Sequence, residues 1–290
     1  MAGRAWSAVA QTGQPHALRG TTTTDNSGTR TAAYTYDKAG NTKTRPGPNG
    51  TQTLVWDAEG HLQSSTDTAG TVSYLYDADG SRLINRDTTG RTLYLPNEEL
   101  RYTNSTATAA CTRFYPFGGG TVAQRTSKGL TWLASDHQGT QDVTLDEKTQ
   151  AATIRRQTPF GTARGQTGLW VNTKGFVGGT VEPTGLTHLG AREYDPSLGR
   201  FISVDPMLTT TDPQSMEGYA YADNSPVVHA DPAGLMISND SGGIDALPPA
   251  ATAPDTAQTG PSPTKPPKPK KCGWGCKFRK RVKLELVSAA

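Results

Sequence analysis

The chain of 290 residues has a net charge of +3, with 33% hydrophobic and 19% charged residues, 32 Gly and 20 Pro. This length suits one large β domain or two small ones, and the composition favours short strands and many turns around a thin core. No apolar run approaches the length of a membrane-spanning helix, and the first residues lack the apolar stretch of a secretory signal, so we expect neither feature in this chain.

Residues 1–33 are rich in Thr and Gly and are predicted to form a lead-in with an incomplete repeat. From residue 34 onward the tetrapeptide Asp-x-x-Gly recurs, with copies that begin at Asp37, Asp57, Asp67, Asp77 and Asp87. An Asp side chain bonds backbone amides two residues on, and Gly adopts a positive φ without steric cost. Each copy therefore predicts a tight reversal, and the residues between copies predict one strand of an antiparallel meander.

An aromatic ring directly precedes the turn aspartate at twenty-residue steps, in Tyr36, Trp56 and Tyr76. Residues two apart on a strand share a face, so Tyr34 pairs with Tyr36 and Tyr74 with Tyr76. These rings are expected to join neighbouring hairpins by contacts within and across strands. A period of this kind indicates a stacked array of units that do not bury a face alone.

The β array is predicted to extend over residues 34–165, with further strands at 112–116 and 130–134. Residues 166–235 have a different sequence pattern, because Gly-rich and Asp-Pro segments replace the regular repeat. A short helix is expected near residues 214–222. The sequence thus predicts a separate unit after the array.

The C-terminal part of the chain has the composition of a linker. Residues 236–271 are rich in Pro, Ser, Ala and Thr and are predicted to be disordered, and residues 272–290 form a short basic segment. From Met236 onward nine Lys or Arg and four acidic residues give a net charge of +5, against −2 for residues 1–235. Such a tail binds nucleic acid or an anionic membrane by charge alone, or it is a solubilising unstructured end.

The sequence contains no pattern typical of a metal or cofactor site. Cys272 and Cys276 are near enough for a local bridge or for two metal ligands, but a zinc site takes about four ligands and all five His lie upstream of the tail. Gly-x-Ser-x-Gly, His-Glu-x-x-His and a phosphate-binding Gly-rich loop do not occur. We therefore predict no metal and no cofactor, and we interpret His137 as a solvated turn residue.

The motifs resemble those of Rhs or YD-repeat proteins over roughly residues 14–235. The Tyr-x-Tyr-Asp-x-x-Gly-Asn repeat is clearest at residues 34–41. An ordered series of later motifs resembles the Rhs-repeat-associated core that precedes a variable tail, and it comprises residues 136–139, 190–196, 199–206 and 231–235. Teneurins and the C component of insecticidal Tc toxins share this architecture.

The resemblance implies a mainly β fold in which an antiparallel YD-repeat hairpin array forms part of a shell. A core plug then folds inward, and a disordered tail follows. In this family the polypeptide after Asp-Pro-x-Gly-Leu is the cargo, commonly a toxin, and in many members the core cuts its own chain after that Leu. The cut would fall between Leu235 and Met236. A closed shell in the family uses far more repeats than this chain has.

The resemblance also implies an aspartyl-protease type of self-cleavage, with Arg192, Asp205 and Asp231 at the matching positions. Two neighbouring carboxyl groups do not both ionise easily, so one keeps a proton while the other activates water. One event per molecule is enough, so we expect single-turnover chemistry and no multiple-turnover activity. The alternatives are that Arg192 is an ion-pair brace for the plug and that the Asp-Pro pairs only initiate turns.

The predicted function is that of the C-terminal part of an Rhs-type toxin or shell protein, which encapsulates an effector and releases it by self-cleavage after Leu235. The alternatives are a non-cleaving structural or cell-surface β-repeat protein and a truncated remnant of a larger Rhs protein. Expected partners are the chain's own C-terminal segment as cargo, an upstream shell-forming polypeptide and an immunity protein. The family suggests a secreted or cell-surface location.

Overall fold

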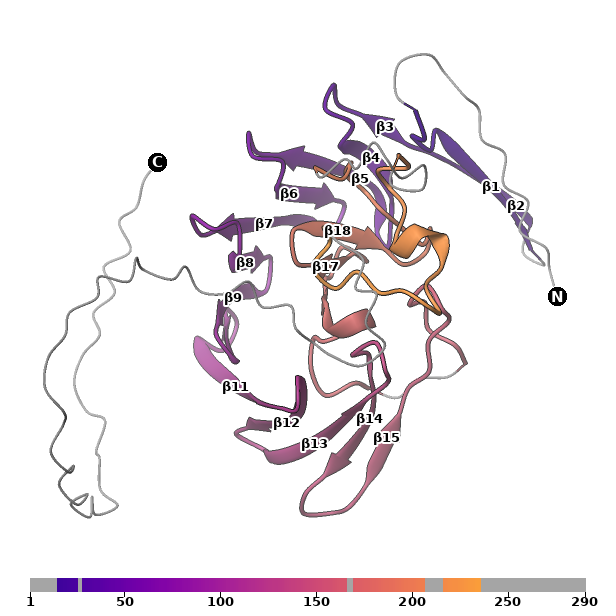
Figure 1. The fold of residues 1–290 in the computed structure, drawn as a ribbon. Coiled ribbons are helices and arrows are strands. Elements are labelled where there is room, and N and C mark those ends of the chain that lie inside the picture. The colour runs from indigo at the N-terminus through magenta and orange to yellow at the C-terminus, as the bar shows by residue number, and fades with distance from the viewer. Residues whose placement is uncertain (1–14, 26–27, 166–168, 207–215, 236–290) are drawn as a thin grey trace, which may run out of the picture. The chain divides into compact units, whose positions relative to one another are not determined.

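The computed structural model describes residues 15–25, 28–165, 169–206 and 216–235. The strands form three antiparallel sheets (Figure 1). The chain divides into two units, residues 1–246 and 247–290, and the second lies outside the described residues. The predicted linker, the basic segment, Met236 and both tail cysteines also lie outside them. Within the described ranges, no helix has the length and apolar character needed to cross a membrane.

The largest sheet has thirteen strands, and every strand pairs with its neighbours in the chain. Its members are β3 (Thr35–Tyr36), β4 (Thr42–Gly47), β5 (Gly50–Trp56), β6 (Leu62–Asp67), β7 (Gly70–Tyr76), β8 (Arg82–Asp87), β9 (Gly90–Leu95), β10 (Glu98–Thr103), β11 (Thr108–Phe117), β12 (Gly120–Thr126), β13 (Gly129–Ser135), β14 (Gln141–Asp146) and β15 (Ala152–Ile154). We call this sheet the wall. It confirms the predicted antiparallel hairpin array.

Two smaller sheets accompany the wall. A hairpin of β1 (Gly20–Asp25) and β2 (Gly28–Ala33) precedes it. A four-stranded sheet follows it, made of β16 (Thr180–Val181), β17 (Thr187–Leu189), β18 (Arg192–Asp195) and β19 (Arg200–Phe201). The short 3₁₀ helices η1 (Phe176–Gly178) and η2 (Ala222–Asn224) flank this sheet in the sequence. We call residues 169–206 and 216–235 together the plug.

Aspartate side chains close the longer turns of the wall, as the sequence predicts. After β5, Asp57 Oδ1 accepts hydrogen bonds from the backbone N–H groups of Glu59 and His61, at 3.0 and 2.8 Å. Gly60 has a φ of +88°, a value that glycine adopts without strain. The same pair of bonds recurs in the turns that begin at Asp37 and Asp77.

Two kinds of turn alternate along the wall, and this alternation explains the sequence period. The long turn of residues 57–61 joins β5 to β6, whereas β6 joins β7 through a two-residue connection between the paired residues Asp67 and Gly70. Asp87 and Gly90 frame the same short connection between β8 and β9. One long turn, one short turn and two strands therefore make the repeating unit.

The aromatic residues before the long turns tie neighbouring hairpins together. Trp56 Nε1 donates to the carbonyl of Thr42 at 2.7 Å, and Tyr76 Oη donates to the carbonyl of Leu62 at 2.9 Å. Each bond spans 14 residues and links one long turn to the one before it. This geometry confirms that the rings connect hairpins, and it adds hydrogen bonds to the expected apolar contacts.

One face of the wall is buried. Leu54 and Tyr74 are 3% and 6% exposed, while the next residues along their strands, Val55 and Leu75, are 46% and 44% exposed. Such alternation is expected for strands with one covered face. The cluster on the buried face joins wall and plug residues: Leu54, Leu62, Tyr74, Leu186 and Ile202.

The plug has an aromatic core of its own. The rings of Phe176, Tyr194, Phe201 and Tyr221 pack with centroid distances between 4.9 and 5.9 Å. These separations are typical of favourable aromatic pairs. The four rings therefore hold η1, β18, β19 and the segment before η2 together.

The short helix expected near residues 214–222 is wrong for its described part. Residues 216–221 form turns, and η2 begins only at Ala222. The carbonyls that a helix would use internally are bonded elsewhere: Phe201 N–H of β19 donates to Tyr219 O at 3.0 Å, and Asp205 N–H donates to Gly218 O at 2.8 Å. Pairing with β19 and with the residues after it thus replaces helical bonding.

Polar side chains also join the wall to the plug. Arg45 of β4 pairs with Asp195 at 2.7 Å, and these residues are 150 positions apart in the chain. Gln124 of β12 accepts from Asn172 Nδ2 at 2.7 Å. In Figure 1 the strands from β4 to β15 curve around β17 and β18. These contacts confirm the predicted inward fold of the core segment.

Candidate functional site

Arg192, at the start of β18, is the centre of a buried ionic site. Its side chain is 3% exposed, and its Nη2 lies 2.8 Å from Asp205 Oδ2 and 3.1 Å from Asp231 Oδ2. The two carboxylates therefore share one guanidinium nitrogen. The side chain of Asp231 is 4% exposed and that of Asp205 is 19% exposed, so one is enclosed and the other is partly open to solvent. The structure brings together the three residues that the sequence analysis singled out.

The closing Asp-Pro-x-Gly-Leu segment turns back on its own aspartate. The backbone N–H of Leu235 donates to Asp231 Oδ1 at 3.1 Å, and that of Gly234 donates to the carbonyl of Asp231 at 3.4 Å. The residue before the expected cut therefore lies against the buried carboxylate. Met236, on the other side of that bond, lies outside the described residues.

Backbone contacts seat this segment on the strand that carries Arg192. Arg192 Nε donates to the carbonyl of Gly234, and the N–H of Ala191 donates to the carbonyl of Ala233 at 2.9 Å. A Cβ atom on Gly190 would lie 2.2 Å from the carbonyl oxygen of Ala233. Only glycine permits so close an approach of the two backbones.

Two groups that the sequence analysis missed hold the guanidinium in place. The ring of Phe201 lies with its centroid 3.6 Å from Arg192 Cζ. The carbonyl of Gly218 accepts from Arg192 Nη1 at 3.2 Å and from the N–H of Asp205 at 2.8 Å. Burial lowers the pKa of Arg192 from its ordinary value, and the carboxylates of Asp205 and Asp231 oppose that shift. The sequence signal for Phe201 was its place in the Gly-Arg-Phe motif.

Tyr221 supports the other side of the site. Its hydroxyl oxygen accepts a hydrogen bond from the backbone N–H of Asp231 at 3.3 Å. Its ring is fully buried in the aromatic core of the plug, and burial raises the pKa of its hydroxyl well above the ordinary value. The buried core thus reaches the backbone of Asp231 directly. No motif singled out in the sequence contains Tyr221, so this role could not be predicted.

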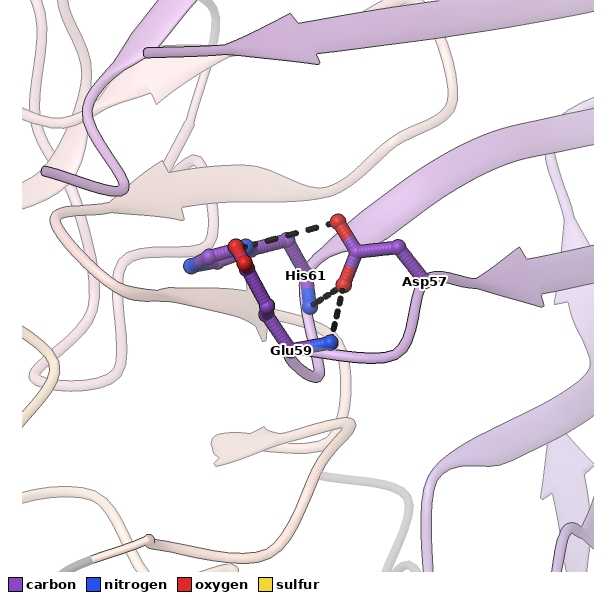
Figure 2. Close-up of side chains that lie close together, drawn as sticks. All are labelled: Asp57, Glu59 and His61. Atoms are coloured by element: carbon purple, nitrogen blue, oxygen red, sulfur yellow. Dashed lines mark hydrogen bonds and ion pairs between the residues drawn. The ribbon is translucent and has the colours of Figure 1, made fainter. Parts of the chain in front are cut away.

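A separate group of possible metal ligands lies in the turn after β5 (Figure 2). His61 Nδ1 lies 3.4 Å from Asp57 Oδ2 and 3.7 Å from Glu59 Oε2, and one atom of each residue lies within 4.8 Å of the others. Carboxylate and imidazole groups are common zinc ligands. In the described part of the chain this is the only such group of three, and its proximity alone assigns no ion.

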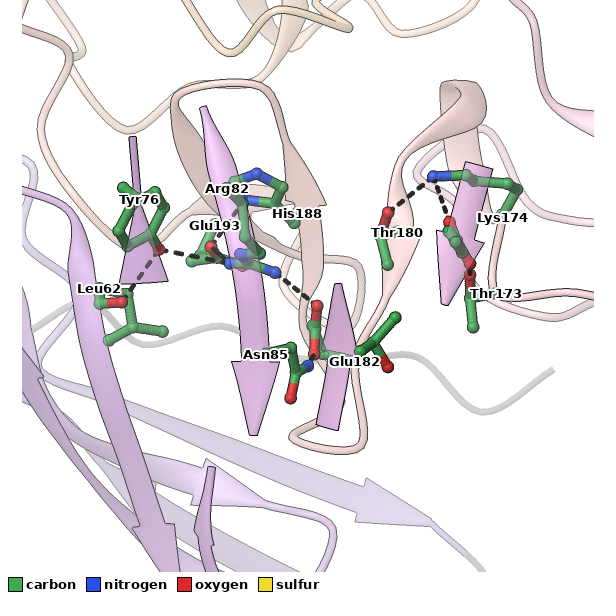
Figure 3. Close-up of polar contacts among 12 residues, drawn as sticks. Leu62, Tyr76, Arg82, Asn85, Thr173, Lys174, Thr180, Glu182, His188 and Glu193 are labelled. Carbon is green, nitrogen blue, oxygen red and sulfur yellow. Dashed lines mark hydrogen bonds and ion pairs between the residues drawn. The ribbon is translucent and has the colours of Figure 1, made fainter. Parts of the chain in front are cut away.

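A second buried ionic cluster joins the wall to the plug through Arg82 of β8 (Figure 3). Arg82 Nη1 donates to Glu182 Oε1 at 2.5 Å, and its Nη2 donates to Glu193 Oε1. Asn85 Nδ2 donates to Glu182 Oε2 at 2.5 Å, and His188 Nδ1 lies 2.9 Å from Glu193 Oε1. Both glutamates are almost fully buried, so this cluster places two acidic groups against one guanidinium.

The two glutamates of this cluster differ in their proton affinity. Burial raises the pKa of Glu182 to about 7, despite the opposing effect of Arg82. Burial acts in the same direction on Glu193, but Arg82 and His188 outweigh it and hold its pKa at about 2. Burial, and then Arg82, lower the pKa of His188. Glu182 is therefore the acidic group of the cluster that binds a proton near neutral pH.

The family model of the Teneurin YD-shell matches residues 21–227. A crystal structure of TcdB2-TccC3 has a TM-score of 0.53 and 26% identity, covering 71% of this chain and 14% of that chain. A structure of the Photorhabdus luminescens Tc holotoxin pore has a TM-score of 0.54 and 26% identity, covering 72% and 13%.

Curated relatives match over a short stretch. Salivary gland surface protein 1 of Aedes aegypti is 49% identical over 55 residues, which is 19% of this chain and 2% of that protein. The tRNA nuclease WapA of Bacillus subtilis (strain 168) is 44% identical over 57 residues, again 19% and 2%. This chain therefore spans a small fraction of each of these proteins. Because the family model covers most of the sequence and the wall has the fold of the Tc shell structures, the chain belongs to the Teneurin YD-shell family of Rhs/YD-repeat proteins.

Proposed function

We propose that this chain is the end of an Rhs-type shell, and that its plug cuts the bond between Leu235 and Met236 once to release the C-terminal segment. The reacting groups are Asp205 and Asp231, and Arg192 positions both. The proposal rests on two contacts of the Asp231 carboxylate. Its Oδ2 lies 3.1 Å from Arg192 Nη2, and its Oδ1 accepts a hydrogen bond from the N–H of Leu235 at 3.1 Å.

The chemistry is hydrolysis of one peptide bond by water. Asp205 is assigned to the activation of water, because its carboxylate is the one partly open to solvent. Water oxygen bonds to the carbonyl carbon of Leu235 and its proton passes to Asp205. The carbon–nitrogen bond then breaks, and the proton that the carboxyl pair retains passes to the nitrogen of Met236. The products are a carboxylate on Leu235 and an amine on Met236.

The fold supplies the remaining contribution to the rate. The substrate is part of the same chain, so its position is already fixed when the plug folds. The guanidinium of Arg192 also donates to the carbonyl of Gly234, one residue before the reacting carbonyl. That contact keeps the backbone of the closing segment at a fixed distance from both acids.

The test is the behaviour of the purified full chain. We expect wild type to yield two fragments, with a new N-terminus at Met236 found by sequencing. Asp205→Asn and Asp231→Asn should each leave the chain whole. Asp79→Asn, which changes an exposed turn residue of the wall, is the matched control and should cleave like wild type.

Folding must be checked separately in each variant. An intact wild-type chain with a normal circular dichroism spectrum and a cooperative unfolding transition would overturn the self-cleavage, and would favour the non-cleaving structural alternative. Cleavage that persists in both carboxylate variants would overturn the assignment of the residues.

The shell itself is proposed to be completed by further repeats. This chain covers 13 to 14% of the Tc shell chains that it resembles, and its wall ends in the short strands β3 and β15. Unpaired strand edges readily pair with another strand. We propose that an upstream repeat segment pairs with the β3 end, and that the assembled shell acts outside the cell, as the name of the Aedes aegypti surface protein indicates for that relative.

A further inference from the structure

A cavity of about 350 Å³ lies where the last wall strands meet the plug. It is lined by the turn after β13, by residues that follow β15 and by the plug residues Phe176, Pro226 and Val227. Three arginines line it: Arg155, Arg156 and Arg164. Wall and plug are also joined at its border, because Gln138 Nε2 donates to the carbonyl of Pro226 at 2.7 Å. The cavity is separate from the site around Arg192.

Arg155 is buried in this region without an acidic partner. It is 9% exposed, its Nε donates to the carbonyl of Gln141 at 2.6 Å, and its guanidinium lies 3.9 Å from the ring centroid of Trp170. Within the described residues, the buried Nη2 has no hydrogen-bond acceptor, and no carboxylate lies within ion-pair distance of the guanidinium. Burial lowers the pKa of Arg155 to about 10, and the more distant charge of Asp142 only partly opposes this.

The other buried arginines of the described chain each have a carboxylate partner, which Arg155 lacks. Arg45 pairs with Asp195, Arg82 with two glutamates, and Arg192 with two aspartates. Arg155 is the one member of this set that lines a cavity and lacks a carboxylate contact. A buried charge without a counter-charge is costly, so the absent partner of Arg155 points to a ligand.

The charges around the cavity favour an anion. Three guanidinium groups face two carboxylates, those of Asp136 and Asp142. Asp136 Oδ1 is already occupied by the backbone N–H groups of Gln138 and Thr140, each at 2.9 Å. Arg155, whose Nη2 lacks an acceptor, and the other two arginines thus line the same cavity.

We propose that this cavity binds an oxyanion, the phosphate or carboxylate group of a small ligand, with Arg155 as its buried counter-charge. Arg156 and Arg164 are exposed and lie at the mouth, where they contact the part of the anion that faces solvent. Planar guanidinium groups bind either kind of oxyanion with paired hydrogen bonds. Because both the wall and the plug line the cavity, a bound anion stabilises their contact.

The test is calorimetric titration of the full chain at constant ionic strength, with inorganic phosphate in one arm and succinate in the other. We expect saturable binding in at least one arm, and the arm that saturates identifies the oxyanion.

Arg155→Gln should weaken that binding by about tenfold or more, because hydrogen bonds to charged groups are strong. Arg164→Gln, at the exposed mouth, should weaken it to a smaller extent and keeps the test valid if Arg155→Gln does not fold. Arg86→Gln, on an exposed position of β8, is the matched control and should bind like wild type.

A thermal unfolding series provides a second readout. The binding anion should raise the unfolding temperature of wild type and of Arg86→Gln, because a ligand of the native state stabilises it. It should have no such effect on Arg155→Gln. Absence of saturable binding in both arms would overturn the proposal, and so would unchanged affinity in Arg155→Gln or in Arg164→Gln.

Discussion

The carboxylate of Asp231 accepts a hydrogen bond from the backbone N–H of Leu235 at 3.1 Å, and this bond closes the turn that the two residues share. The contact places an enclosed acidic group beside the residue whose carbonyl is proposed to react. Arg192 Nη2 contacts the other oxygen of the same carboxylate, Oδ2, at 3.1 Å. The geometry of the closing motif therefore depends on a strand that lies about forty residues earlier in the chain.

Replacement of Arg192 should be costly for both folding and cleavage. Arg192→Gln leaves two carboxylates without their guanidinium, and breaking a buried pair typically costs about 3 to 5 kcal/mol. We expect a loss of that order in the free energy of unfolding, measured by urea denaturation, together with an intact chain on gels. Arg101→Gln is the control: its pair with Asp87 is also 2.8 Å long, but the arginine is 31% exposed, so the loss should stay below about 1 kcal/mol. Equal losses in the two variants would contradict the buried ionic site.

Gly190→Ala should displace the closing segment. Its new Cβ would meet the carbonyl oxygen of Ala233 at 2.2 Å, so the two backbones must separate. We expect a loss of stability in thermal unfolding and a slower appearance of fragments. Gly60→Ala is the matched variant, because Gly60 also has a positive φ but has no atom within 4 Å of the new Cβ. Gly60→Ala should lower the free energy of unfolding only by the backbone strain of an alanine at positive φ, about 1 to 2 kcal/mol, and should leave cleavage unchanged. If Gly190→Ala behaved like Gly60→Ala, the close approach would have no role.

Tyr221→Phe should act on the position of Asp231 and not on the fold alone. The variant removes the acceptor of the Asp231 N–H, and an unsatisfied buried donor costs about 1 to 3 kcal/mol. Tyr194→Phe removes a similar bond, from Tyr194 Oη to the carbonyl of Phe160 at 2.9 Å, in the same aromatic core. We expect both variants to lose stability but only Tyr221→Phe to slow cleavage, as followed by the fraction of intact chain over time. A similar rate in the two variants would remove Tyr221 from the positioning of the site.

The stability of the chain should depend on pH through Glu182. Its pKa rises from an ordinary 4.5 to about 7 on folding, so the folded protein binds a proton in this range that the unfolded chain has released. The stability that this proton contributes is present below about pH 4.5 and is lost as the pH rises towards about 7. Compared with wild type, Glu182→Gln should therefore become progressively more stable across this range, as measured by urea denaturation at several pH values.

Asp146→Asn is the control for that series. Hydrogen bonds from Thr149 and Lys148 hold the pKa of Asp146 below its ordinary value, so this carboxylate is ionised in both the folded protein and the unfolded chain well above pH 4.5. Its difference from wild type should stay constant between about pH 5.5 and pH 7. Burial lowers the pKa of His188, which contributes the opposite slope to the stability of every variant, so comparison with wild type at each pH isolates Glu182. A difference that does not change with pH in Glu182→Gln would contradict the proposed proton uptake.

The turns of the wall could be predicted from the sequence, because their determinants are local. Asp57 bonds amides two and four residues on, and Gly60 needs only its own backbone freedom. The pair of Arg82 and Glu193 could not be predicted in this way, since 111 residues separate them and the motif of residues 190–196 that contains Glu193 does not indicate its partner. Only the folding of the plug onto the wall places them together.

Some residues of the candidate site could be predicted from the sequence and others could not. Arg192, Asp205 and Asp231 were recognised through their motifs, and the structure brings them within contact of one another. The roles of Phe201 and Gly218 were missed. Phe201 lies within the motif of residues 199–206, but that motif does not show that the ring packs against a guanidinium, and a backbone carbonyl such as that of Gly218 leaves no pattern in the sequence. The predicted helix near residues 214–222 failed for the same reason, since tertiary pairing and not local propensity determines that segment.

The central claim is best tested by synthesis of the full chain in water enriched in oxygen-18, followed by mass spectrometry of the fragments. Hydrolysis by an activated water predicts that the N-terminal fragment ends at Leu235 and carries one heavy oxygen in its new carboxylate, while the other fragment begins at Met236. A chain that stays whole in its folded state, or a fragment that ends at Leu235 without the heavy oxygen, would contradict the account.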